Sequence, residues 1–530
     1  EPVSASEHLL TQILRQEMGF DGVAVADYSA VSNVHHTQKL YETEAEAGLA
    51  CLSAGMDVEL PDTVCFNEEM KAMFAQGKAD MALLDQAVRR VLRAKFRMGL
   101  FEHPFALTGS ALSEMVHHPE DELITLQSAL ESLVLLKNDN HVLPVGKNVR
   151  KIALIGPHAD NARHFFGGYT HLSMVEAIHA VMNSLAGVDA SNTERKPMLT
   201  VPGTQVQSDE TEEFAQIWRQ IKPDCPSLLA KLTSSLPDAE ITYAYGYPIA
   251  GADESHFAEA LQTAAGADLV ILTLGGKHGS GSVATMGEGV DATDINLPRC
   301  QDAFIRAAAN LHKPMIGIHF GGRPISSDAA DECLDAILEA WNPSEMGAEA
   351  LKRVLTGETA PSGRMPVTTA RSAGQIPVYY NHPNGSSWHQ GDSIGFQEYV
   401  DMPHRPRYYF GQGLSYTTFA YDGLRIDKEE VGPREKITVS CQVTNTGSRA
   451  GTEVVQLYLR DEQACMVRPV QELVGFARVA LEPGESRQVC FTFRPDRMAF
   501  LNREMRWLVE KGMIGVRIGA SSEDIRLRGA

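Results

Sequence analysis

The pattern of apolar positions in the first hundred residues alternates between the helical and the extended period. Apolar residues at helical spacing predict a helix that ends near Gly19, a second over residues 40–53 and a third over 84–98. Between them, the apolar runs at 23–26 and 56–60 predict two short strands. This alternation is typical of the last quarter of a (β/α)8 barrel.

The middle of the chain carries short apolar runs separated by helical stretches. A helix is expected over residues 120–136, followed by a turn signal at 137–139 that opens the next domain. Runs of this kind, with helices before them, predict a mostly parallel sheet covered on both faces. The expected strands are 152–155, 268–274, 314–319 and 336–341, with helices at 255–264 and 301–311.

The period changes to two after Thr417. Apolar residues alternate with polar ones in the segments 437–443, 455–459, 489–493 and 514–518, which predicts a small antiparallel sandwich. The expected organisation is a barrel-like segment over 1–105, a linker with a helix over 106–147, an α/β sandwich domain over 148–380, a connector over 381–418 and a β-sandwich over 419–530.

Charge and composition exclude several classes of partner. The 530 residues carry a net charge of −21, so the basic surface that nucleic acid or anionic membrane requires is missing. No apolar stretch approaches the roughly 20 residues that span a bilayer. We therefore expect a neutral small molecule as the partner, with no nucleic acid and no membrane.

The eight cysteines are scattered and show neither a CxxC pair nor a histidine spacing suited to zinc. We expect buried free thiols and no metal site. Free thiols favour a reducing, cytoplasmic compartment, while secretion stays open if a leader has been removed.

Two carboxylates stand out as candidates for chemistry. Asp27 follows the predicted strand at 23–26, and the carboxyl ends of strands are where α/β barrels place their catalytic groups. Glu288 lies in a loop after the predicted strand at 268–274, between two glycines that leave its carboxylate uncrowded. By spacing alone, Glu288 also fits an ordinary solvated acidic loop.

Several motifs in collinear order resemble glycoside hydrolase family 3. They include Ala-Gly-Met-Asp-Val-Glu-Leu-Pro at 54–61, Pro-Ser-Gly-Arg-Met-Pro at 361–366 and Phe-Gly-Gln-Gly-Leu-Ser-Tyr-Thr at 410–417. The other segments that carry the resemblance are 19–28, 88–101, 132–138, 155–160 and 287–298.

The resemblance implies a (β/α)8 barrel, an α/β sandwich and a fibronectin type III-like domain. It implies that Asp27 is the nucleophile and that Glu288 is the general acid/base, contributed by the sandwich domain. In a retaining glycosidase two such carboxyl groups lie about 5 to 5.5 Å apart, so the active site is expected between barrel and sandwich. Tyr28, next to the nucleophile, matches a position where the family has an aromatic residue that packs on a sugar.

Three further residues are candidates for substrate contacts. Lys277 and His278 open the glycine-rich stretch ahead of Glu288, and Tyr169 follows a pair of glycines. Each of them also fits an ordinary surface role.

The chain departs from the family pattern in what it lacks. The earlier barrel strands, which in the family supply most groups that hold the sugar hydroxyls, have no counterpart before Glu1. We therefore expect the C-terminal portion of a retaining, exo-acting β-glycosidase, most simply a β-glucosidase, that needs an N-terminal barrel polypeptide as partner. A homo-oligomer is a further possibility.

Several alternatives stay open. Within the family these are a β-xylosidase and a β-N-acetylglucosaminidase, and outside enzymes a carbohydrate-binding or structural remnant. Residues 279–284 fit a GxGxxA dinucleotide fingerprint, but no helix-like segment follows to receive a pyrophosphate, so no cofactor is expected.

Overall fold

The computed structural model describes residues 1–116, 118–185 and 198–530, which divide into two compact units, 1–118 and 119–530. The first unit is helical. Its elements are η1 (Val3–Ala5), η2 (His8–Glu17), α1 (Ser32–His36), α2 (Glu44–Ala54), α3 (Glu68–Ala75), α4 (Met81–Arg97) and α5 (Gly109–Val116).

The two strands predicted in the first unit are reduced to one parallel bridge between Val25 and Val58. Ala26 N donates to Val58 O at 2.9 Å, and Val58 N donates to Ala24 O at 3.2 Å. In the described ranges these two extended segments pair with no other strand, and one such pair makes too few hydrogen bonds for a regular sheet. The strands predicted at 23–26 and 56–60 thus lie where the chain is extended and paired, but the pairing is a single bridge and not a regular strand pair.

Asp57 ties the elements of the first unit together. Its buried carboxylate accepts from Arg15 Nη2 at 2.8 Å, from Arg90 Nη1 at 2.7 Å and from Ala24 N at 2.9 Å. Arg15 lies in η2 and Arg90 in α4, so one carboxylate joins two helices to the segment that ends at Asp27. A buried charge that is paired on several sides in this way fixes geometry.

The second unit contains an α/β domain built on one mixed sheet. The strand order is β1-β8-β7-β4-β2-β3, in which β1 runs antiparallel to β8 and all other neighbours are parallel. The strands are β1 (Val134–Asn138), β2 (Lys151–Ile155), β3 (Glu240–Ala244), β4 (Leu269–Gly275), β7 (Met315–Phe320) and β8 (Ala336–Trp341).

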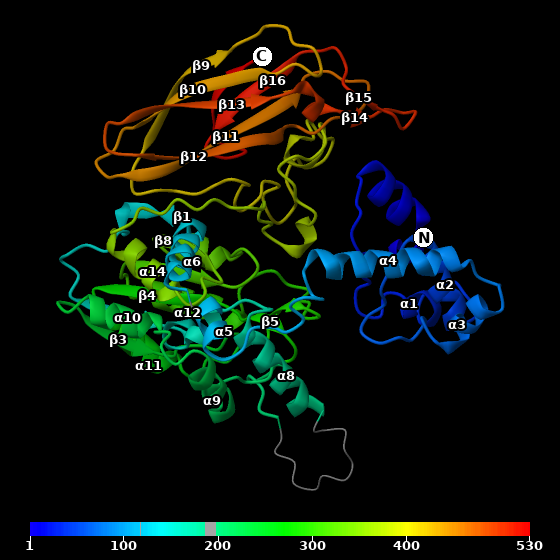
Figure 1. Ribbon diagram of the computed structural model, residues 1–530. Coiled ribbons are helices and arrows are strands. Elements are labelled where there is room, and N and C mark those ends of the chain that lie inside the picture. Colours follow the sequence, from blue (N-terminus) through cyan, green and yellow to red (C-terminus); the bar gives the residue numbers. More distant parts are fainter. Residues whose placement is uncertain (117, 186–197) are drawn as a thin grey trace. The chain divides into compact units, whose positions relative to one another are not determined.

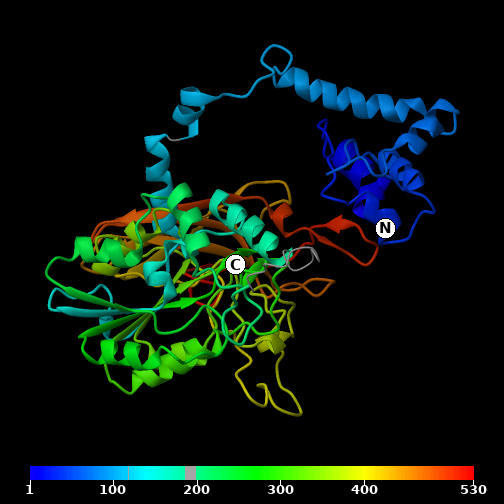
Figure 2. The same cartoon turned by 90° about the horizontal axis from the view of Figure 1, so that it is seen from below.

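Helices cover both faces of this sheet, as predicted (Figures 1 and 2). One face packs on α6 (Pro119–Ser132), α7 (Pro157–Asp160), η4 (Ala162–Phe165), α10 (Leu228–Ser235) and α14 (Gly347–Thr356). The other packs on α11 (Phe257–Ala265), α12 (Arg299–Ala309) and α13 (Asp328–Cys333). Also in this domain are α8 (His171–Leu185) and α9 (Glu212–Ile221).

The sequence misassigned one edge of the sheet and missed the other. The helix predicted over 120–136 ends at Ser132, and residues 134–136 belong to the buried strand β1. A short apolar run does not distinguish a buried helix end from a buried strand, and here pairing with β8 decides. At the other edge, β3 mixes exposed and buried residues and lacks the apolar run that marked its neighbours.

The C-terminal part is a β-sandwich of two antiparallel sheets, with orders β13-β10-β9 and β12-β11-β16-β17. Alternating residues of both sheets, such as Val439, Val455 and Ile518, form its core. The strands are β9 (Phe419–Ile426), β10 (Ile437–Asn445), β11 (Gly451–Asp461), β12 (Glu472–Leu481), β13 (Ser486–Phe493), β16 (Ile514–Gly519) and β17 (Ile525–Gly529), with a small hairpin of β14 (Phe500–Leu501) and β15 (Trp507–Leu508). The predicted sandwich is confirmed.

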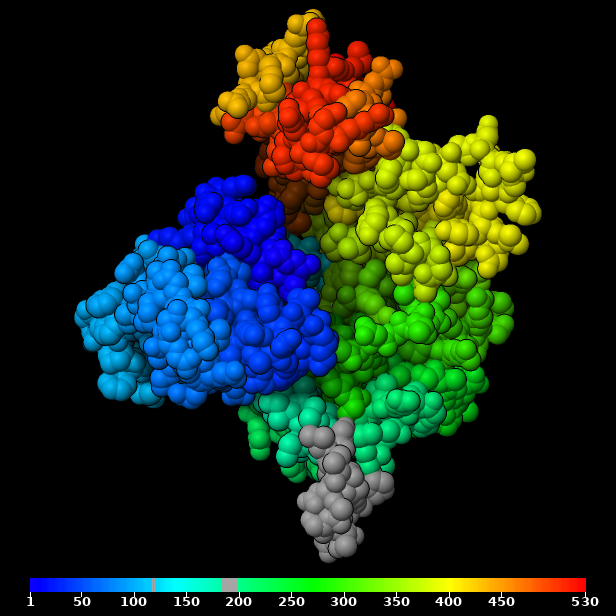
Figure 3. Space-filling view, turned by 90° about the vertical axis from the view of Figure 1, so that its right-hand side faces the viewer, coloured from blue at the N-terminus to red at the C-terminus, as the bar shows by residue number. Residues whose placement is uncertain are grey.

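The connector over 381–418 is ordered without a long helix or strand and lies on the surface between the two domains (Figure 3). Gly411 O accepts from Gln456 Nε2 of the sandwich at 3.1 Å. Arg364 of the α/β domain pairs with Glu453 of β11 at 2.6 Å. These contacts join both domains into one unit.

None of the helices in the described ranges is long and apolar enough to cross a membrane.

We predict that Asp57→Ala destabilises the first unit by about 3–5 kcal/mol, because it leaves the charges of Arg15 and Arg90 without their carboxylate. Amide hydrogen exchange should accelerate in peptides from residues 1–118 and stay unchanged in those from 119–530. Asp21→Ala is the matched control, since Asp21 pairs with Arg97 on the exposed surface. Equal effects of the two substitutions would contradict the role of Asp57.

Candidate active site

Glu288 lies at the end of a small parallel pair of strands that follows β4. In this pair, β5 (His278–Ser280) aligns with β6 (Met286–Glu288), so that Ser280 faces Glu288. Gly287 has φ +135°, and a Cβ there would lie 1.9 Å from Gly279 O, so only glycine fits. Glu288, the next residue, is exposed.

Tyr169 is the side chain that the structure brings to Glu288. Its hydroxyl donates to Glu288 Oε2. Tyr169 lies in the loop before α8 at φ +65°, and Thr170 Oγ1 braces that loop by donating to Gly167 O at 2.9 Å. The aromatic side chain is exposed, so its ring is open to a ligand.

The two loops meet for a topological reason. In the sheet, β2 lies between β3 and β4, so the chain leaves β2 and β4 in opposite directions. Loops at the carboxyl ends of such strands leave a crevice, which is where α/β sheets bind ligands. Tyr169 comes after β2 and Glu288 after β4, so they border this crevice from its two sides.

His278 contacts the loop that carries Tyr169. Its Nδ1 accepts from Gly168 N at 2.8 Å, and the side chain is half-buried. The structure thus gives the imidazole a bond to the protein backbone, where the sequence suggested a contact to substrate.

Lys277, also predicted to contact substrate, is 1% exposed. Its Nζ pairs with Glu176 Oε2 at 2.5 Å and with Asp209 Oδ2 at 3.2 Å. A buried ammonium held by two carboxylates has a structural task, and its Nζ is closed to a substrate by burial.

These residues belong to a buried charge cluster, which we define as Arg163, His164, Glu176, Asp209 and Lys277. Arg163 Nη2 lies 3.2 Å and His164 Nε2 3.1 Å from Asp209 Oδ2. Burial opposes ionisation of Asp209, but Lys277, His164 and Arg163 outweigh it and hold the pKa of this carboxyl well below its usual range. The cluster joins η4, α8 and the segment before α9 to the start of β5.

The sequence did not reveal this cluster. Its members are far apart along the chain, and a single arginine or glutamate in a helix resembles any solvated residue. The one available signal was the Arg163-His164 pair set between apolar neighbours.

In the first unit, Asp27 and Tyr28 follow the bridged segment directly. Asp27 Oδ1 accepts from Tyr28 N at 2.7 Å, and both side chains are exposed. Ser29, at φ +60°, donates its N–H to Leu60 O at 2.9 Å, which closes the turn beneath them. Asp27 is thus presented to solvent on a braced turn.

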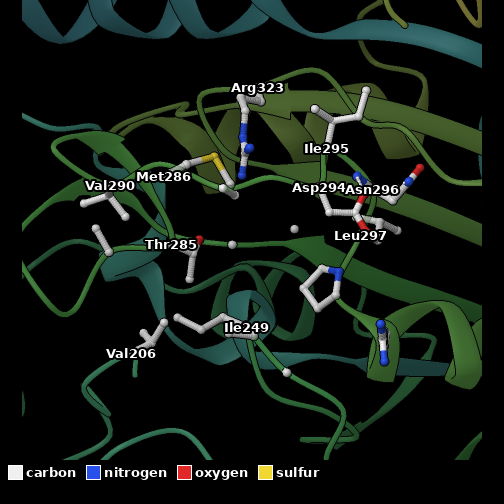
Figure 4. Close-up of a pocket in the computed structure, with 18 of the residues that line it drawn as sticks. Val206, Ile249, Thr285, Met286, Val290, Asp294, Ile295, Asn296, Leu297 and Arg323 are labelled. Carbon is white, nitrogen blue, oxygen red and sulfur yellow. Dashed lines mark hydrogen bonds between the residues drawn. The ribbon is translucent and has the colours of Figure 1, made fainter. Parts of the chain in front are cut away.

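A pocket of about 780 Å³ lies beside the segment that carries Glu288, at the carboxyl ends of β4 and β7. Met286 and Val290, which flank Glu288, line it, and Figure 4 shows Arg323 among apolar side chains such as Ile249 and Ile295. The pocket gives this edge of the sheet room for a small molecule. Within the described residues, no three histidine, cysteine, aspartate or glutamate side chains gather as a metal site.

Comparison with known proteins identifies the family of this chain. Residues 133–416 match the glycosyl hydrolase family 3 C-terminal domain, 453–522 a fibronectin type III-like domain, and 1–94 the glycosyl hydrolase family 3 N-terminal domain. The chain belongs to glycoside hydrolase family 3. The resemblance inferred from the sequence motifs is thus confirmed.

Among its relatives in family 3, a periplasmic β-glucosidase of Salmonella typhimurium is 32% identical over 99% of this chain and 65% of its own length. A β-xylosidase of Formosa agariphila is 31% identical over 98% of this chain and 66% of its own length. The chain therefore spans just under two thirds of these relatives.

A solved structure of a β-glucosidase from Listeria innocua in complex with isofagomine is similar to this chain with a TM-score of 0.80. It is 28% identical, and the match covers 98% of this chain and 65% of that one.

We predict that Asp209→Asn destabilises the second unit by about 3–5 kcal/mol at neutral pH, because the buried Lys277 and Arg163 lose a carboxylate that they share. The folded-state pKa of Asp209 lies below the unfolded value of about 3.9, so its contribution is full above that pH and declines as the pH falls below it.

The deficit of Asp209→Asn relative to the native chain should therefore shrink below about pH 4. Urea unfolding at pH 7 and pH 3 measures the loss of stability and its dependence on pH. Amide exchange in peptides around Lys277 then locates the loss. Asp496→Asn, an exposed residue of the β-sandwich, is the control. A deficit that is independent of pH would argue against an ionised Asp209.

Proposed function

We propose that this chain is part of a retaining, exo-acting β-glycosidase that hydrolyses terminal β-linked glucose, with β-xylosides as the alternative substrates. The observation that carries the proposal is the exposed Glu288 carboxylate, bonded to Tyr169 at the crevice of the sheet. Family membership and relatives named β-glucosidase and β-xylosidase support the substrate class.

The proposed chemistry is a double displacement. The Asp27 carboxylate attacks the anomeric carbon while Glu288 protonates the departing glycosidic oxygen, which leaves a glycosyl ester on Asp27. Glu288 then removes a proton from water, which attacks the same carbon and releases the sugar and Asp27. This mechanism requires the two carboxyl groups to lie about 5 to 5.5 Å apart in the assembled enzyme.

Tyr169 suits the second half-reaction. Its hydroxyl donates to Glu288 Oε2, which orients the carboxylate that this step uses as a base. Its exposed ring, and that of Tyr28 beside Asp27, offer apolar faces on which a sugar can pack.

We further propose that the first unit is the last part of a (β/α)8 barrel and that a further barrel polypeptide completes it. Among the described residues the segments at Val25 and Val58 pair with each other and with no other strand, and unpaired edges attract further strands. A groove of about 600 Å³ beside α4 is lined by apolar side chains such as Phe66, Met70 and Leu84. Neighbouring helices of a barrel would cover such a groove.

Two other functions account less well for Glu288 and Tyr169. A β-N-acetylglucosaminidase of this family uses an acid/base pair in a barrel loop and would leave Glu288 without a task. A carbohydrate-binding or structural remnant would leave unexplained why Glu288 and Tyr169 are paired at the crevice.

We also propose a reducing compartment. All eight cysteines lie in the described part of the chain and none forms a disulfide there. Cys465 and Cys490 are exposed, which an oxidising compartment would not favour.

We predict that Asp27→Ala nearly abolishes turnover of a β-glucoside in the complete assembly and that azide restores it as an α-glycosyl azide, because azide replaces the missing nucleophile. Glu288→Ala should lower kcat by about 10² to 10⁴-fold on a poor leaving group, and far less on dinitrophenyl β-glucoside, which leaves without protonation. Full activity of Glu288→Ala on a methyl β-glucoside would refute its assignment.

We predict that the 530-residue chain by itself does not turn over a chromogenic β-glucoside, and that a polypeptide supplying the rest of the barrel restores activity. The reason is that the groups expected to hold the sugar hydroxyls come from the earlier barrel strands. Activity of the chain alone would contradict this dependence, and inactivity of a folded complex would favour the remnant.

A further inference from the structure

The His278 imidazole is enclosed between two backbone segments. A Cβ added at Gly168 would lie 3.4 Å from the ring, and one added at Gly322 would lie 2.5 Å from its Cδ2 atom. Glycine at these positions lets the backbone approach the ring this closely. The ring is therefore packed and bonded at the same time.

The bond from Gly168 assigns the tautomer. Because the backbone N–H can only donate, His278 Nδ1 must be an unprotonated acceptor, and the ring proton is on Nε2. An imidazolium, which donates from both nitrogens, could not make this bond.

The bonded glycine is next to Tyr169, whose backbone lies in the left-handed region at φ +65°. Such a conformation is strained in a residue other than glycine, so neighbouring bonds must hold it. The bond of Gly168 to His278 and that of Thr170 Oγ1 to Gly167 O lie on either side of Tyr169.

The same imidazole is also tied to Glu288. His278 and Glu288 lie on the paired strands β5 and β6, and Tyr169 O–H donates to Glu288. His278 and Glu288 are thus connected in two ways. One connection is the pairing of β5 with β6, and the other is the loop of Gly168 and Tyr169, which bonds to His278 at one residue and to Glu288 at the next.

We propose that His278 is a positioning residue that holds the loop 167–170 so that the Tyr169 hydroxyl stays on the Glu288 carboxylate. Its consequence for acid/base catalysis rests on the proposed glycosidase function, whereas its effect on the loop does not. Without the Nδ1 acceptor, Tyr169 leaves its strained conformation and Glu288 loses its hydrogen-bond donor.

A direct contact of His278 with a sugar hydroxyl is the competing role. Two observations oppose it: Nδ1 is already used by Gly168, and Gly322 covers the ring edge that carries Nε2. A positioning role and a sugar-binding role differ in one measurable respect. A substitution of His278 changes the amide exchange of the loop 167–170 without substrate only if His278 positions that loop.

The test uses the full 530-residue chain with two substitutions. His278→Phe keeps an aromatic ring and removes the acceptor, whereas His278→Asn places an amide oxygen close to the position of Nδ1. Amide exchange is followed in the peptide that contains Gly168, with His171→Phe, at an exposed position of the same region, as control.

We expect exchange at Gly168 to accelerate on the order of tenfold in His278→Phe, and to stay near the native rate in His278→Asn and His171→Phe. Unchanged exchange in His278→Phe overturns the proposal. Equal acceleration in His278→Phe and His278→Asn also overturns it, because ring packing rather than the acceptor would then hold the loop.

In the complete assembly, His278→Phe should lower kcat on a methyl β-glucoside about tenfold more than on dinitrophenyl β-glucoside, with little change in KM. A rise in KM on both substrates with kcat unchanged would instead indicate direct sugar binding and overturn the catalytic consequence. If the native assembly hydrolyses no β-glycoside, the proposed function fails, and amide exchange still decides the position of the loop.

Discussion

The geometry of the second unit around Glu288 depends on one buried ammonium group. Lys277 is the second residue after β4, and its Nζ is held by Glu176 of α8 and by Asp209. The β5 strand starts at the next residue, so the position of this ammonium group determines where β5 begins after the chain has left the six-stranded sheet. Removing a charge of this kind from water is costly, and the two carboxylates offset that cost only in a narrow range of positions.

The first unit uses the same physical device. Asp57 is a single buried carboxylate that two arginines and a backbone N–H surround. In both units the exposed carboxylate, Asp27 or Glu288, lies at or next to a very short pairing of two segments, the Val25–Val58 bridge in one unit and the β5–β6 pair in the other. In both units buried ion pairs join the elements that flank these short pairings.

The layers of the fold were predictable because apolar periodicity reports burial. The runs that became β2, β4, β7 and β8 are buried along almost their entire length, so their composition alone identified them. The two edge strands of the sheet were not predictable, because apolar periodicity reports burial and not pairing. The strand β3 is only partly buried, and β1 is a short apolar run whose identity depends on a partner some 200 residues away.

The candidate site shows the same division. Motifs in the sequence were sufficient to identify the family and to single out Asp27, Glu288 and Tyr28 as candidates, because motifs and residue types are local properties. Three contacts came from the tertiary structure: Tyr169 bonds to Glu288, Lys277 is buried by its ion pairs, and His278 accepts from Gly168. Each of these contacts joins segments roughly 100 residues apart, and their side chains come together only when burial and the order of strands in the sheet bring the loops to one edge.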